Sequence, residues 1–201
     1  MDKENIIKHY CAKAERAVRR MSRKEIGDIY AISFWKDNVD DDPRRPVVTI
    51  GYNTVSHAEA QKQNASNAME AKWNYAYWMQ DDTGTLGGND TMLRIYFKDE
   101  GLFYTLHELN KAEKQEENGN PEGYMMIEEK DRQMQEAFMD IVIEVANRLH
   151  RNETITRAWG GALPVIIHEL EYYDQPVEWT AKANPTPLVA EFMEWYRSFA
   201  K

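Results

Sequence analysis

Apolar residues recur every three or four positions in three stretches of the chain, which is the spacing of amphipathic helices. They do so over residues 6–21, 134–149 and 188–199, with charged residues between them. Thr186 followed by Pro187 adds an N-cap and first-turn pair before the last stretch. The pattern predicts three helices, of which the middle one is the most regular.

Other stretches have the composition of strands. Residues 29–35 (IYAISFW) are almost continuously apolar, which predicts a strand covered on both faces. After a polar turn, residues 47–52 (VVTIGY) alternate and predict a returning strand. We expect two further strands at residues 92–97 (MLRIYF) and 164–170 (PVIIHEL).

The segments between these elements are less regular. Ser56 and Glu59 form an S-x-x-E capping box, which predicts a helix, or two shorter helices, running toward residue 73. Residues 83–90 (TGTLGGND) predict a flexible loop, and residues 101–109 (GLFYTLHEL) suit a strand or a short helix. The charged stretch 110–123 contains Asn-Gly and Asn-Pro and predicts a mobile insertion.

No Pro/Gly/Ser-rich linker divides the 201 residues. We therefore expect one α+β domain over residues 1–201, in which a mixed or mainly antiparallel sheet is flanked by helices. The core should include the aromatic cluster of residues 73–78 (WNYAYW), because each such ring buries a large apolar area.

Charge and composition reduce the range of possible partners and cellular locations. The net charge of −9 opposes phosphate-backbone binding, so we expect no nucleic-acid partner. Cys11 is the single cysteine and implies no oxidising compartment. The N-terminus does not have the pattern of a secretory signal, and no run is long and apolar enough for a membrane span. These features predict a cytoplasmic protein without a membrane partner.

Catalytic and cofactor motifs are weak. His168 beside Glu169 and Glu171 is the most enzyme-like group, but on a strand the histidine and the two acids would point to opposite faces. The acidic turn beginning at Asp37 lacks the glycine and glutamate of a calcium loop, and the glycines at 84–88 match no phosphate-binding motif. No serine has the nucleophile-elbow context, which lowers the expectation of a hydrolase. We expect no catalytic residue, metal or cofactor.

Two acidic-aromatic segments suit protein recognition better. Residues 78–82 and 168–179 combine tyrosines and tryptophans, which are favoured at interfaces, with acidic side chains that should be exposed. The predicted interaction surface comprises Trp78, Asp81, Asp82, Glu169, Glu171, Tyr172, Tyr173 and Asp174. The alternative interpretation is that the aromatic rings of these residues fill the hydrophobic core.

The motifs FWKDN, EAKWNYAYW, VIIHELEYYD and KANP, spread over most of the chain, resemble an uncharacterised bacterial family known only as a domain of unknown function. The resemblance implies a small single-domain α+β protein. Some proteins of this kind look like cytoplasmic immunity partners of secreted toxins, and the resemblance brings no catalytic residues.

These sequence observations lead to two functional hypotheses. The first is a non-enzymatic protein-interaction role with a protein partner, for which the acidic charge favours a basic protein, as in toxin-immunity pairs. The alternative is an enzyme or small-ligand binder with a site near His168, Glu169 and Tyr172. The sequence does not determine the oligomeric state.

Overall fold

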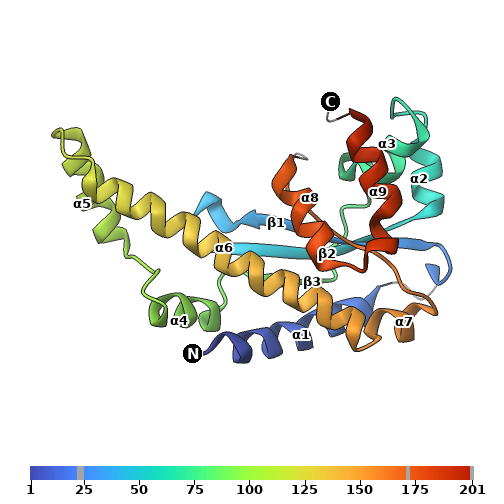
Figure 1. Cartoon of the computed structure of the whole chain (residues 1–201), viewed down its shortest axis with the longest axis horizontal. Coiled ribbons are helices and arrows are strands. Elements are labelled where there is room, and N and C mark those ends of the chain that lie inside the picture. The colour runs from blue at the N-terminus through green and yellow to red at the C-terminus, as the bar shows by residue number, and fades with distance from the viewer. Residues whose placement is uncertain (22–24, 171–172, 200–201) are drawn as a thin grey trace.

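The computed structural model describes residues 1–21, 25–170 and 173–199, and the elements below are those of these ranges (Figure 1). Four strands form one mixed sheet in the order β3-β2-β1-β4. Its central pair is antiparallel, β3 pairs antiparallel with β2, and β4 pairs parallel with β1. The strands are β1 (Ile29–Asn38), β2 (Pro46–Thr54), β3 (Gly84–Gly87) and β4 (Val165–His168).

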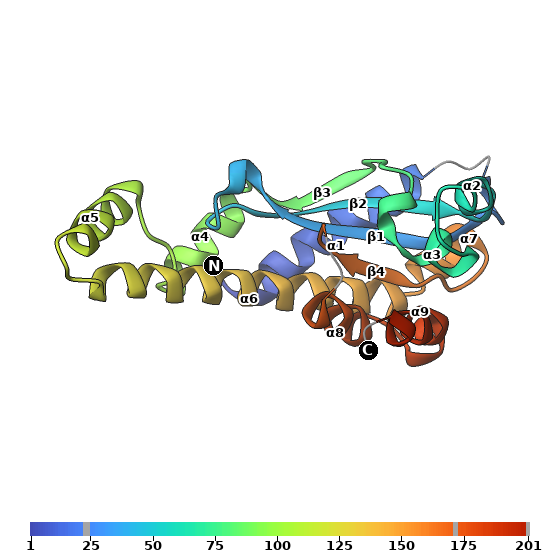
Figure 2. The ribbon, with the colours of Figure 1, turned by 90° about the horizontal axis from the view of Figure 1, so that it is seen from above.

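Helices lie on both sides of this sheet, which confirms the predicted α+β class with a mixed sheet (Figures 1 and 2). The helices are α1 (Lys3–Arg20), α2 (Val55–Gln61), α3 (Ala68–Trp73), α4 (Thr91–Asp99), α5 (Leu106–Glu117), α6 (Glu122–Arg151), α7 (Thr154–Trp159), α8 (Asp174–Ala183) and α9 (Thr186–Phe199), with short 3₁₀ turns at Val39–Asp41 and Tyr75–Tyr77.

The two faces of the sheet bury different clusters, because alternate residues of a strand point to opposite sides. Ile32 and Phe34 of β1 face a large core shared with α1 and α6. Ala31 of β1 and Ile166 of β4 face a smaller aromatic core with α3 and α9. In Figure 1, α1 lies below the sheet, whereas α2, α3 and α9 gather above it. The predicted burial of the aromatic cluster is confirmed at Trp73, which is 3% exposed.

Residues 92–97, predicted as a strand, belong to helix α4 instead. The side chain of Asp90 caps this helix by accepting a hydrogen bond from the backbone N–H of Met92. Leu93, Tyr96 and Phe97 are buried at helical spacing. Six residues are too few to separate this pattern from the alternation of a strand.

Two segments also differ from the prediction, and a third decides between two predicted alternatives. The segment 83–90, predicted as a loop, contains β3, which is held by pairing with β2 rather than by an apolar pattern of its own. The N-cap of α2 is Thr54 rather than Ser56. In residues 101–109 the helical alternative is correct, because Thr105 and Glu108 form a capping box that begins α5.

The charged stretch 110–123 is largely helical, where the sequence predicts an irregular insertion. It comprises most of α5, a turn, and the start of α6. In both views α5 and the first turns of α6 extend away from the sheet as a helical hairpin (Figures 1 and 2). The mobility of this stretch stays a prediction. Helices α7 and α8 were not expected from the sequence.

Among the described residues, none of the helices combines the length and the apolar content that crossing a bilayer requires.

Candidate functional site

The parallel pairing of β1 with β4 brings Ser33 and His168 together. Ser33 lies opposite Ile166, and Trp35 lies opposite His168. The Ser33 Oγ atom is 2.7 Å from His168 Nε2, and the two residues are only 8% and 3% exposed. Each residue is a polar side chain on a mainly apolar, buried strand. Their hydrogen bond therefore satisfies two groups that would otherwise be costly to bury.

Aromatic rings enclose His168. The Tyr75 ring stacks on the imidazole with centroids 4.4 Å apart, and the Trp78 ring meets it edge-on at 6.0 Å. Burial lowers the pKa of His168 to about 3, although the nearby Glu169 carbonyl acts in the opposite direction. The imidazole is therefore neutral near pH 7 and a weak base. Since a general base works best with a pKa near the working pH, this pair is poorly suited to activate Ser33.

A pocket of about 200 Å³ opens beside this pair. Trp35 and the exposed acids Asp81 and Asp82 contribute to its lining, together with Thr49, Met79 and Gln80. The Trp35 Nε1 atom is buried and has no hydrogen-bond partner within the described ranges. Neither Asp81 nor Asp82 forms an ion pair or hydrogen bond with a side chain that the structure describes. The pocket, called the acidic-aromatic pocket below, therefore combines π-faces with unpaired negative charge.

The backbone of β2 sets the position of these acids. A Cβ atom at Gly51 would lie 2.5 Å from the Asp81 carbonyl oxygen, so only glycine allows this approach without a shift. Next to the acids, the Thr83 N–H donates to the Ile50 carbonyl at 2.8 Å. The segment with Asp81 and Asp82 thus lies close against β2 and is held there by the hydrogen bond of Thr83.

The structure brings only part of the predicted interaction surface to this pocket. Trp78, Asp81 and Asp82 line it, and Trp78 is 4% exposed, so its ring is a wall rather than a free surface. Glu171 and Tyr172 lie outside the described residues.

The remaining predicted surface residues lie outside the pocket lining. Glu169 forms an ion pair with Lys36 at 2.7 Å in which both side chains are largely buried. Glu169 also accepts a hydrogen bond from the Tyr173 hydroxyl. Asp174 accepts one from the Tyr196 hydroxyl at 3.1 Å. These acids therefore have internal partners, in contrast to Asp81 and Asp82.

Sequence reasoning missed Ser33, Trp35 and Tyr75 as parts of the site. One signal was present: Ser33 in IYAISFW and His168 in PVIIHEL are isolated polar residues in buried strands, which must find partners. Their pairing follows only if the two strands are neighbours in the sheet. No local sequence pattern specifies which strands are neighbours.

Within the described ranges, no three His, Cys, Asp or Glu side chains converge as a metal ion would require. Comparison of the chain with known protein families, with curated proteins and with solved structures finds no match.

Proposed function

We propose that the protein binds a basic protein partner and that the acidic-aromatic pocket receives a lysine or arginine side chain of that partner. The observation that carries this proposal is the combination of three aromatic walls with Asp81 and Asp82, two exposed carboxylates without an internal cation. Cations bind favourably over aromatic faces, and carboxylates pair with guanidinium and ammonium groups.

The size of the pocket supports a side chain as its occupant. Its volume of about 200 Å³ is below the roughly 300 to 1,000 Å³ typical of sites for drug-sized ligands. The small volume therefore favours a single side chain over a drug-sized molecule as the occupant.

The net charge of −9 favours association with a basic protein by electrostatic steering. In a cytoplasmic immunity protein, the role that the bacterial resemblance implies, such binding would neutralise a toxin. This biological role depends on binding at the same pocket, so a result that overturns the binding proposal also removes this role.

The alternative function is a small-ligand binder or enzyme that uses the same pocket. The Ser33–His168 pair favours it, because polar groups at the floor of an aromatic pocket orient small ligands. The low pKa of His168 favours binding over catalysis.

Calorimetry with a short arginine-containing peptide tests the proposal, and the same peptide with citrulline in place of arginine is the uncharged control. Asp81→Asn with Asp82→Asn should weaken binding about ten-fold or more, and less at high salt. The matched control is Glu113→Gln with Glu116→Gln, which makes the same charge change on exposed positions of α5 and should leave binding unchanged.

Equal binding of the arginine and citrulline peptides, or of wild type and the Asp81/Asp82 variant, would overturn the proposal. If argininamide alone binds as tightly as the peptide, the small-ligand function replaces it.

A further inference from the structure

A second cavity lies beyond the end of β1, between the turn that follows this strand and the start of α4. Its volume is about 310 Å³. Three arginines line it, Arg44, Arg45 and Arg94, together with Asn89 and Phe103. This concentration of guanidinium groups contrasts with the net charge of −9 of the whole chain.

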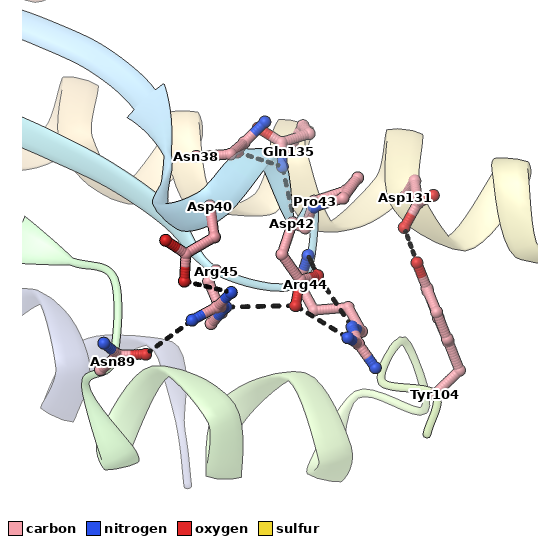
Figure 3. A network of polar contacts seen from close by, with 10 residues as sticks. All are labelled: Asn38, Asp40, Asp42, Pro43, Arg44, Arg45, Asn89, Tyr104, Asp131 and Gln135. Atoms are coloured by element: carbon pink, nitrogen blue, oxygen red, sulfur yellow. Dashed lines mark hydrogen bonds and ion pairs between the residues drawn. The ribbon is translucent and has the colours of Figure 1, made fainter. Parts of the chain in front are cut away.

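The two acids in the lining already have partners. Asp42 accepts hydrogen bonds from Arg44 Nε at 2.8 Å and Nη2 at 2.7 Å, and from Arg45 Nε at 3.1 Å (Figure 3). Asp90 lies 3.4 Å from Lys13 Nζ and 3.2 Å from His9 Nε2. The negative charge in the cavity is therefore balanced from within the protein.

The arginines are held in place by different contacts. The Arg44 guanidinium lies over the Tyr104 ring at 5.4 Å, and the Tyr104 hydroxyl donates to Asp131 at 2.6 Å. Arg45 reaches Asp40 at 2.9 Å and comes within 3.5 Å of the Asn89 side-chain oxygen (Figure 3). Two guanidinium groups are thus fixed at the cavity before any ligand arrives, which lowers the entropy cost of binding.

Arg94 differs from the other two. It lies in the first turns of α4 and is exposed, and its guanidinium group has no hydrogen bond or ion pair to any residue within the described ranges. Lys98, one turn further along α4, lies over the Phe103 ring at 5.1 Å. The cavity therefore keeps uncompensated positive charge beside an aromatic wall.

We propose that this cavity binds a phosphorylated small molecule, with the phosphate between Arg94 and the Arg44–Arg45 pair and the organic part against Phe103. Guanidinium groups match phosphate oxygens in two-pronged hydrogen bonds. A site with several guanidinium groups suits a phosphate dianion better than a carboxylate, which carries a single charge. The acidic-aromatic pocket and its proposed partner are independent of this site.

Calorimetric titration of the full chain at low salt with phenyl phosphate, inorganic phosphate and benzoate tests the proposal. Phenyl phosphate should bind most tightly, inorganic phosphate more weakly because it does not contact Phe103, and benzoate most weakly. Phe103→Ala should remove the advantage of phenyl phosphate over inorganic phosphate.

Arg94→Gln should weaken phenyl phosphate binding about ten-fold or more. Because the Arg94 guanidinium has no hydrogen bond or ion pair to lose within the described residues, the melting temperature of the free protein should stay unchanged. Arg197→Gln, the same change at an exposed position on α9, is the matched control and should bind like wild type.

Three results would overturn the proposal: the absence of saturable binding by either phosphate compound, equal binding of benzoate and phenyl phosphate, or unaltered binding by Arg94→Gln.

Discussion

The side chain of Asn184 hydrogen-bonds both backbone groups of Val165. Its Oδ1 accepts from the Val165 N–H at 2.8 Å, and its Nδ2 donates to the Val165 carbonyl at 2.7 Å. Thr180 does the same at Ile167, where its hydroxyl oxygen accepts from the N–H at 2.9 Å and its hydroxyl donates to the carbonyl at 3.0 Å. Since β4 is the last strand of the sheet, these side chains of α8 and its C-cap take the place of a neighbouring strand.

We expect Asn184→Ala to lower the free energy of unfolding by about 2 to 4 kcal/mol, because it leaves a buried N–H and a buried carbonyl without partners. Chemical denaturation measures this change. Asn64→Ala, at an exposed position, should change stability by less than about 0.5 kcal/mol. Similar losses for both variants would show that the edge contacts contribute little.

His168 should make stability depend on pH. Its pKa is lowered from 6.5 in the unfolded chain to about 3 in the fold. As the pH falls below 6.5 the unfolded chain takes up the proton first, so stability present above that pH is lost toward pH 3. The slope from this group approaches about 1.4 kcal/mol per pH unit.

Urea denaturation between pH 7 and 4 checks this, with His168→Gln compared with wild type. The variant should show a flatter pH dependence, and His107→Gln, on an exposed histidine, should keep the wild-type slope. If His168→Gln keeps the full slope, the imidazole is accessible to protons in the folded state.

Trp73→Ala should cost about 3 to 5 kcal/mol, because it removes a buried indole and leaves a cavity. The ring is 3% exposed and packs edge-to-face on Tyr30 and Phe192, with centroids 5.5 and 5.8 Å away. Equilibrium denaturation gives the value, and Tyr77→Ala, at a half-buried ring in the same segment, should cost less. A loss below about 1 kcal/mol would mean that this aromatic cluster does not anchor the fold.

Limited trypsin treatment should cut the chain first at Lys111 or Lys114. Both are exposed on α5, a helix whose only fully buried residue in the described structure is Ala112, so local opening there should be easy. Replacing both lysines by glutamine should delay the first cut. Early cleavage elsewhere while these two sites stay intact would show that the hairpin of α5 and α6 is firmly ordered.

Local pattern was enough to predict α1, the second half of α6 and α9 from their helical period, and β1, β2 and β4 from their strand composition. It was not enough for α4, whose alternating residues suit a strand until the cap at Asp90 is taken into account. It also missed β3, whose order comes from its neighbour rather than from its own residues.

The candidate site, like the fold, was predictable from the sequence only in part. The burial of the aromatic cluster follows from its composition, and the acids Asp81 and Asp82 were identified from the sequence. The floor of the pocket was not, since Ser33 and His168 are 135 positions apart. Only the parallel pairing of β1 with β4 joins them, and hydrophobic periodicity does not specify which strands become neighbours.

That pairing has a consequence for synthesis on the ribosome. A nascent chain that has emerged as far as α6 can pair β1 with β2, but the other edge of β1 has no partner until residues 165–168 follow. During this interval the growing polypeptide presents an unpaired, apolar strand edge of the kind that recruits other chains. The sheet therefore closes only after residues 165–168 have emerged, and chains released before β4 should be prone to aggregation.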